Sequence, residues 1–335
     1  MAKGIGIILV VFGHAWRGIE AAGVLPSDEM FRIVDSAIYA FHMPLFFFLA
    51  GWFFPGTLKR FGQRELLSRI FWRLFYPMCL WTYIFIALKI LAGTTPNDSV
   101  GFIDLLILPV PGQLHLWFLW AMILIQGTMV LLRPLALQGM APFFAVALGV
   151  TVLLWISSLV PGSEWTSGAI RSAPFFCLGA MWHLLEREIP GSRKTAWLAV
   201  VALVIAEGVV LMQSEAGPAL RLLIGVTAVM AVLIIIRACE ARAGRLGRVL
   251  VLLGQYSMTI YLMHTIFSAA IRILLSKGLG IEAIIPTLIL TVLGGIFVPL
   301  VVHLRPVPAM LTKMLGLPGA NTLTLVETSR TPVRP

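Results

Sequence analysis

Long apolar stretches, each close to the length that a bilayer core requires, constrain this sequence more than any other feature. A helix needs about 20 consecutive, mainly apolar residues to cross the hydrocarbon core. Ten stretches approach that length, near residues 3–22, 33–54, 74–92, 114–132, 141–160, 171–185, 195–212, 218–236, 249–272 and 283–303. The sixth is short and contains Pro174. The sequence therefore predicts an all-α fold, a polytopic membrane protein with about ten transmembrane helices in one bundle.

The composition and the distribution of charge agree with this prediction. Of all residues 59% are hydrophobic and 12% are charged, whereas a soluble domain carries about twice that share of charge. The net charge of +10 does not indicate a nucleic-acid partner, because the basic residues lie in loops between apolar stretches. With the N-terminus in the cytoplasm, 18 basic residues fall on the cytoplasmic side and 6 on the other. This bias predicts that both termini are cytoplasmic.

The rest of the chain offers no second domain with its own core. We expect one membrane domain over residues 1–303 and a cytoplasmic tail over 304–335, largely disordered because it is rich in Pro, Thr and Gly. The three cysteines, Cys79, Cys177 and Cys239, are widely spaced and odd in number. They predict neither a disulfide framework nor a zinc site. No cleavable signal peptide is visible.

The first apolar stretch carries a cation at its start and a histidine near its middle. Lys3 and His14 lie eleven residues apart, which on a helix leaves them about 20° from eclipsed and about 16 Å apart along the axis. An ionisable group inside a membrane span is a functional hypothesis by default. The alternative interpretation is a histidine that is hydrogen-bonded inside a helix bundle.

The second apolar stretch repeats this feature. His42 lies about midway along it, as His14 does along the first, and Pro44 should kink the helix. Adjacent antiparallel helices would bring the two imidazoles to a similar depth. The alternative is a pair of polar groups that satisfy each other in the bundle.

A basic pair precedes the third stretch. Arg69 and Arg73 stand four residues apart, a spacing that places two guanidinium groups on one helical face. Arginine pairs recognise phosphates well, so this pair predicts an anion site. Ordinary anchoring by positive charge on the cytoplasmic side is the alternative.

Two later segments are also polar or aromatic. The aromatic residues after His115, Trp117 to Trp120, are expected as anchors at the membrane interface. In the ninth stretch Ser257, Tyr261 and His264 form a polar stripe on one helical face. Such a stripe faces a bundle interior or a cavity, although hydrogen bonding between helices alone would explain it.

Five motifs occur together in this order: KGIGIILVVFGHA, FHMPLFFFLAG, the arginine pair before Pro77, HLWFLWA and YSMTIYLMH. In this order and spacing the chain resembles the acyltransferase-3 family from residue 3 to about residue 303. These are integral membrane acyltransferases with a ten-helix core, and many are O-acetylases of surface glycans. The opening stretch is most similar to the subgroup that resembles fucose 4-O-acetylase.

The resemblance implies roles for particular residues. His14 matches the catalytic histidine of the family, and Lys3 stands where many members have arginine. Arg69 and Arg73 match the basic pair, although the family often has two intervening residues where this chain has three. Ala50 replaces a frequent serine, so no serine nucleophile is expected there. Members usually have a longer leader before the Lys3 position, which leaves a truncated or misassigned start open.

The implied reaction moves an acetyl or short acyl group from cytoplasmic acetyl-CoA to a hydroxyl of a surface or exported glycan or glycolipid. His14 would act as general base or transient acyl carrier and His42 would orient it, while Lys3, Arg69 and Arg73 hold the coenzyme A phosphates. Contacts to the acceptor or to an oxyanion are expected from Ser257, Tyr261 and His264. Acetyl-CoA is then a co-substrate, no cofactor or metal is bound permanently, and the location is a bacterial-type cytoplasmic (inner) membrane.

Two other readings of the sequence remain. A proton-coupled secondary transporter of a small anionic or sugar-like solute would also bury histidine and arginine in a helix bundle. The chain could also be an export or regulatory scaffold that catalyses no reaction. In that case the five motifs would occur together by chance. The oligomeric state and the identity of the acceptor do not follow from the sequence.

Overall fold

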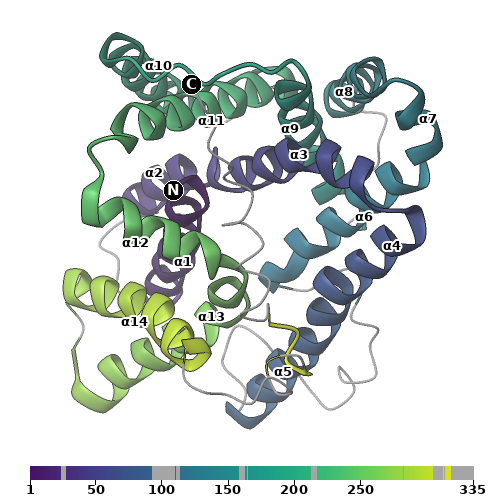
Figure 1. Ribbon diagram of the computed structural model, residues 1–335. Coiled ribbons are helices and arrows are strands. Elements are labelled where there is room, and N and C mark those ends of the chain that lie inside the picture. The colour runs from purple at the N-terminus through teal and green to yellow at the C-terminus, as the bar shows by residue number, and fades with distance from the viewer. Residues whose placement is uncertain are drawn as a thin grey trace.

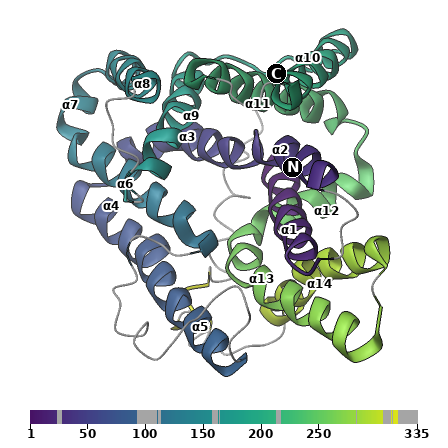
Figure 2. The ribbon, with the colours of Figure 1, turned by 180° about the vertical axis from the view of Figure 1, so that it is seen from behind.

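The computed structural model describes residues 1–23, 28–92, 110, 114–157, 163, 165–212, 217–281, 283–304, 312 and 314–317. Within these ranges the chain is helical and contains no strand, which confirms the predicted all-α membrane fold. Figures 1 and 2 show α10 and α11 along one edge, α4 and α5 as one long rod along another, and α13 with α14 at a third corner.

The helices follow the predicted stretches closely, with small differences at their ends. In chain order they are α1 (Ala2–Glu20), α2 (Asp28–Tyr39), α3 (His42–Arg60), α4 (Gln63–Ile70), α5 (Tyr76–Ala92), α6 (Trp117–Leu131), α7 (Arg133–Gln138), α8 (Met140–Ile156), α9 (Ser167–Leu184), α10 (Arg193–Met212), α11 (Pro218–Glu240), α12 (Gly244–Gln255), α13 (Ser257–Ile273) and α14 (Ile284–Leu304).

Seven helical segments within the described ranges are long and apolar enough to cross a membrane, and α6 and α8 are shorter apolar helices. The sixth predicted stretch corresponds to α9, which contains Pro174 and Arg171 and is not one of the seven. The number of ten membrane spans therefore stays a prediction, while the multi-pass character is clear.

Helix α1 runs without interruption from Ala2 to Glu20, so Lys3 and His14 do share one helix. It packs against α2 and α3 in the antiparallel sense. Near its start the Lys3 Nζ atom lies 5.5 Å from the centroid of the Phe53 ring. Further along, a side chain at Gly13 would come within 3.2 Å of the Tyr39 ring. The adjacency expected for the first two predicted helices is therefore correct.

Pro44 does more than kink the second predicted helix. The helix is interrupted between Tyr39 and His42, which divides it into α2 and α3. Proline has no N–H group and cannot donate to the carbonyl four residues earlier, which belongs to Ala40. The interruption falls at that carbonyl. Because of this interruption, the direction of α3 is not determined by the direction of α2.

Pro77 has a related effect between α4 and α5. The residues Phe71–Phe75 form a π-helical turn, in which the Tyr76 N–H donates to the Phe71 carbonyl. Proline leaves the Arg73 carbonyl without its usual helical donor, and the wider turn accommodates this loss. The helix therefore starts about eleven residues before the predicted stretch at 74–92 and continues through the turn.

Helices α3 and α9 cross at two glycines. A side chain at Gly51 would overlap the carbonyl oxygen of Phe176, and one at Gly179 would overlap the carbonyl oxygen of Phe48. Small residues allow two membrane helices to approach to backbone contact. Phe47 and Phe48 are fully buried around this crossing, which places the phenylalanine-rich motif in the core.

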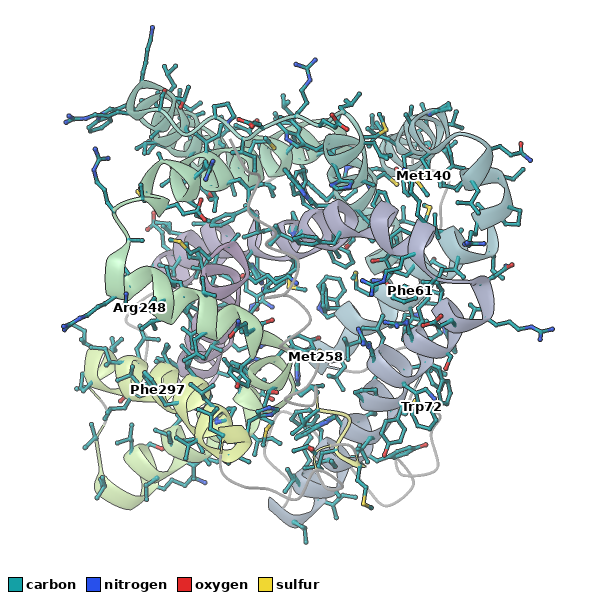
Figure 3. The ribbon with its side chains drawn as sticks, viewed as in Figure 1. Phe61, Trp72, Met140, Arg248, Met258 and Phe297 are labelled. Atoms are coloured by element: carbon teal, nitrogen blue, oxygen red, sulfur yellow. The ribbon has the colours of Figure 1, made fainter. Side chains whose placement is uncertain are left out.

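The ninth predicted stretch is two helices rather than one. Tyr256 interrupts it, ending α12 and beginning α13. Gly247, Leu250 and Leu253 are the buried residues of α12, and a side chain at Gly4 of α1 would overlap the Leu250 carbonyl oxygen. Arg248 lies on the exposed side of the same helix (Figure 3). Helix α12 therefore lies across the start of α1, in front of it in Figure 1.

A short piece of the expected C-terminal tail is described, and it is packed. The Tyr76 hydroxyl donates to the Met314 carbonyl at 2.6 Å, and the Trp81 Nε1–H donates to the Leu315 carbonyl at 3.0 Å. Leu317 is 6% exposed and belongs to the same hydrophobic cluster as Trp81. These hydrogen bonds connect the segment 314–317 to α5. The rest of residues 305–335 lies outside the described ranges, apart from Thr312.

Candidate active site

Three histidine rings from distant parts of the chain meet inside the bundle. His14 comes from α1, His115 from the 3₁₀ turn Leu114–Leu116 before α6, and His264 from α13. The ring centroids lie 5.1 Å apart for His14 and His264, 5.7 Å for His14 and His115, and 5.2 Å for His115 and His264. We call these three residues the histidine cluster.

The members of the histidine cluster differ in exposure. His264 is fully buried and His115 is 6% exposed, whereas His14 is only partly buried. Sequence reasoning treated the region of His115 as an interfacial anchor and did not assign that histidine a role. The signal that could have found it is the HLWFLWA motif, in which His115 precedes the aromatic residues.

Aromatic side chains hold His115 in place. Its ring packs edge-on against Phe85, with centroids 4.9 Å apart, and against Tyr261 at 5.4 Å. The Tyr261 hydroxyl donates to the main-chain oxygen of His115. Tyr261 was predicted to contact acceptor or oxyanion, and the structure places it beside the histidine cluster as a tether for one of its members.

The hydrogen bonds of His264 fix its tautomer. Its Nδ1 atom lies 2.8 Å from the carbonyl oxygen of Tyr261 and 3.1 Å from that of Ile260. Carbonyl oxygens only accept hydrogen bonds, so Nδ1 carries the proton and a neutral His264 has its lone pair at Nε2.

Two nitrogens of the histidine cluster are buried and have no partner in the described part of the chain. Within the described residues, neither His264 Nε2 nor His115 Nε2 has a hydrogen-bond partner. Buried polar atoms are nearly always paired, and an orphan calls for an explanation. A ligand with hydroxyl or N–H groups between these rings would supply the missing partners. The described part of the chain contains no group of three His, Cys, Asp or Glu side chains arranged to hold a metal ion.

His42 lies on a neighbouring helix but has other contacts. Its Nδ1 atom lies 2.6 Å from the Ile38 carbonyl oxygen, and its ring packs edge-on against Tyr39 with centroids 4.5 Å apart. The rings that pack against His14 are those of His115 and His264. His42 is therefore positioned by the turn that Pro44 creates, and the expected orienting role for it stays a prediction.

A polar group that sequence reasoning missed follows His14 by one helical turn. Arg17 forms a bidentate ion pair with Asp35, with N–O distances of 2.7 and 2.9 Å. Its guanidinium also stacks on the Tyr39 ring at 3.5 Å. This group joins the end of α1 to α2, and the Tyr39 ring that it contacts also packs against His42. The spacing of three residues from His14 was the signal available in the sequence.

The predicted phosphate-binding cations occupy exposed or partly exposed positions of α1, α4 and the π-helical turn. Lys3 is exposed at the start of α1. Arg69 pairs with Glu65 at 2.9 Å and stacks on Phe61 at 3.7 Å, near the junction of α3 and α4 where Figure 3 labels Phe61. Arg73 is exposed in the π-helical turn. The two arginines therefore differ, because one already has a carboxylate partner.

The remaining predicted contact, Ser257, is the first residue of α13 and is partly exposed. It is nearly two helical turns from His264 along the helix. The structure thus brings Tyr261 and His264 of the predicted stripe together with His14, and it leaves Ser257 at the helix start. The Trp120 indole N–H donates to the Trp165 carbonyl at 2.8 Å, a structural contact.

The fold and the site define a polytopic membrane protein with a cluster of three histidines enclosed by its helices. The profile of the acyltransferase-3 family, described as an acyltransferase domain, matches residues 1–303. The chain therefore belongs to this family, which confirms the resemblance of the five motifs.

Two curated relatives are similar to part of the chain. The nodulation protein NolL of Sinorhizobium fredii is 29% identical over 183 residues, and NolL of Mesorhizobium japonicum is 28% identical over 189 residues. Each match covers 54% of this chain and 46% of the relative. The chain thus spans about half the length of the curated relatives it matches. No solved structure matches it.

Proposed function

We propose that this chain transfers an acetyl or other short acyl group from acyl-CoA to a hydroxyl of a surface or exported glycan or glycolipid. The observation that carries the proposal is the histidine cluster, in which a partly exposed His14 lies against two buried imidazoles. Histidine is the side chain that most often takes a proton from a reacting hydroxyl.

The charged end of acyl-CoA cannot enter hydrocarbon, so its phosphates must stay at a membrane surface. Lys3 lies about 16 Å along the axis of α1 from His14. It is a cation at the start of the helix that carries the reacting histidine. Arg73 is an exposed guanidinium in a second long helical segment, Gln63–Leu91. Phosphates bound to these groups leave the pantetheine arm to run between the helices toward His14.

The reaction at His14 is a displacement at the thioester carbonyl. Neutral imidazole removes the proton of the acceptor hydroxyl while its oxygen attacks the carbonyl carbon. A C–O bond forms, the C–S bond breaks, and the proton passes from His14 to the leaving sulfur. His115 and His264 are buried beside His14, which limits the water that competes with the acceptor hydroxyl.

The proposed location is a bacterial cytoplasmic membrane with both chain termini in the cytoplasm. Both relatives belong to bacteria, and the basic residues gather at one set of loops as the positive-inside rule requires. This orientation gives the acyl donor access from the cytoplasm. The acceptor then reaches the histidine cluster from the other side or from within the bilayer.

A transfer assay with the purified protein in detergent tests the proposal. Radiolabelled acetyl-CoA should lose its label to a glycan acceptor, or to water when no acceptor is present. In proteoliposomes the protein should not accumulate a solute in response to a proton gradient. Gradient-driven uptake without any loss of the acetyl label would contradict the proposal and would favour a transporter.

A further inference from the structure

We infer that His264 is a positioning residue for His14. In this inference its Nε2 lone pair accepts a hydrogen bond from one nitrogen of His14, which leaves the other nitrogen free to take the acceptor proton. The inference rests on the proposed function, because it assigns a role within the same acyl transfer. It concerns a residue that acts through another and does not itself touch the reacting atoms.

The helix that carries His264 fixes its tautomer. Two carbonyl oxygens, those of Ile260 and Tyr261, lie within hydrogen-bond distance of Nδ1. Both belong to the preceding turn of α13, so the helix itself holds the ring. The only lone pair that His264 can offer is therefore at Nε2, and that atom is buried and has no partner among the described residues.

His14 lies close enough to His264 for a hydrogen bond between the two rings. The ring centroids lie 5.1 Å apart, a separation at which two ring nitrogens that face each other come within about 3 Å. A rotation of the His14 ring is enough to form the bond, because His14 itself is only partly buried. Among the described residues, no hydrogen bond fixes the His14 ring in the way that Nδ1 of His264 is fixed.

His14 acquires a positive charge during the proposed transfer. When His14 takes the acceptor proton, both of its nitrogens carry hydrogens and both need acceptors. His264 Nε2 supplies one of them. In Ser-His-Asp hydrolases the same task belongs to a carboxylate. A neutral imidazole performs it without adding an ionised group to an apolar interior, where such a group is costly.

The proton balance stays simple in this arrangement. The acceptor hydroxyl gives its proton to His14, the new C–O bond forms, and the C–S bond to coenzyme A breaks. His14 then gives the proton to the sulfur. His264 keeps its Nδ1 proton throughout and accepts one hydrogen bond, so it changes neither charge nor protonation.

Two substitutions at His264 test the inference. His264→Asn keeps an amide donor close to the position of Nδ1 and so preserves the bond to the Tyr261 carbonyl, but it removes Nε2. We expect the KM for acetyl-CoA to stay within about twofold and kcat to fall by about 10² or more, the range for loss of a properly poised general base. His264→Ala should lose as much of kcat as His264→Asn does. Added imidazole should raise the kcat of His264→Ala by at least about tenfold, because it fills the space left by the ring.

A matched control is His303, a histidine in another membrane helix whose Nδ1 lies 3.2 Å from Thr259 Oγ1. His303→Asn should keep the wild-type kcat. A kcat for His264→Asn above about a tenth of wild type would overturn the inference, as would His264→Ala that imidazole does not rescue. If His14→Gln is inactive while His264→Asn is normal, only this inference fails. If the wild-type protein transfers no acyl group, the proposed function fails with it.

Discussion

The hydroxyl of Tyr261, in α13, donates a hydrogen bond to the main-chain oxygen of His115, in the turn that precedes α6. This bond joins two segments that are 146 residues apart and that each supply a member of the histidine cluster. Because both groups are buried, the loss of either leaves the other without a partner. The geometry of the cluster therefore depends on a contact outside the three imidazole rings.

Replacing Tyr261 by Phe should weaken the cluster without changing the shape of the core. The orphaned carbonyl of His115 costs about 1–3 kcal/mol, so the melting temperature in detergent should fall and kcat should fall with it. Tyr256→Phe is the matched control, because Tyr256 packs on His303 and not on the cluster. Equal stability and equal kcat for Tyr261→Phe and wild type would show that the hydrogen bond from Tyr261 does not position the histidine cluster.

Replacing Gly51 by Ala should disrupt the crossing of α3 and α9. The added methyl group would overlap the Phe176 carbonyl oxygen, and overpacking of a core typically costs about 1–3 kcal/mol or more. Gly56→Ala lies on the same helix, where nothing is within 4 Å of the added carbon, and should be neutral or slightly stabilising. Thermal unfolding of the two variants in one detergent compares them directly. Similar melting temperatures would contradict the close crossing.

The two arginines near the π-helical turn should contribute unequally to donor binding. Arg69 already has Glu65 as a partner, so Arg73→Gln should weaken acetyl-CoA binding more than Arg69→Gln does. A lost charge-assisted hydrogen bond corresponds to about 1.5–3 kcal/mol, or roughly tenfold or more in Kd. Arg64→Gln removes the same charge from an exposed position of α4 and is the control. Unchanged affinity for acetyl-CoA when both Arg69 and Arg73 are replaced would show that the two arginines act only as membrane anchors.

Labelling of introduced cysteines tests the orientation of the chain. In a background without the three native cysteines, Gly62→Cys and Ala22→Cys lie at opposite ends of α1 and α3. Because Lys59, Arg60 and Arg64 surround Gly62, the positive-inside rule predicts that this site faces the cytoplasm. An impermeant thiol reagent applied to whole cells should modify the site at 22 and spare the site at 62. The reverse labelling pattern would show that the chain has the opposite orientation in the membrane.

Hydropathy was enough to predict the helices, because the cost of exposing polar backbone to lipid leaves few alternatives. The interruption near Pro44 was foreseen as a kink. The break at Tyr256 was missed because an amphipathic helix and a membrane helix follow each other there without a polar loop. A count of apolar residues does not separate them.

The composition of the histidine cluster could be predicted only in part. Equal depth favoured His42 as the neighbour of His14, and α1 does pack beside α3. The rotation of a helix about its axis decides which side chain faces which neighbour, and periodicity does not fix that rotation between two helices. His115 and His264 meet His14 through contacts between segments more than a hundred residues apart, for which one sequence holds no signal besides the motifs.

The substitution His14→Gln tests the central claim most directly. Glutamine keeps much of the size and hydrogen bonding of histidine but cannot act as a base near neutral pH, so it separates structure from chemistry. The measurement is the rate at which purified protein transfers label from acetyl-CoA, with the melting temperature confirming that the variant folds. We predict a loss of about 10²–10⁴-fold, as expected for removal of a general base. A folded His14→Gln protein that retains more than about a tenth of wild-type transfer, a loss smaller than the low end of that range, would contradict the mechanism.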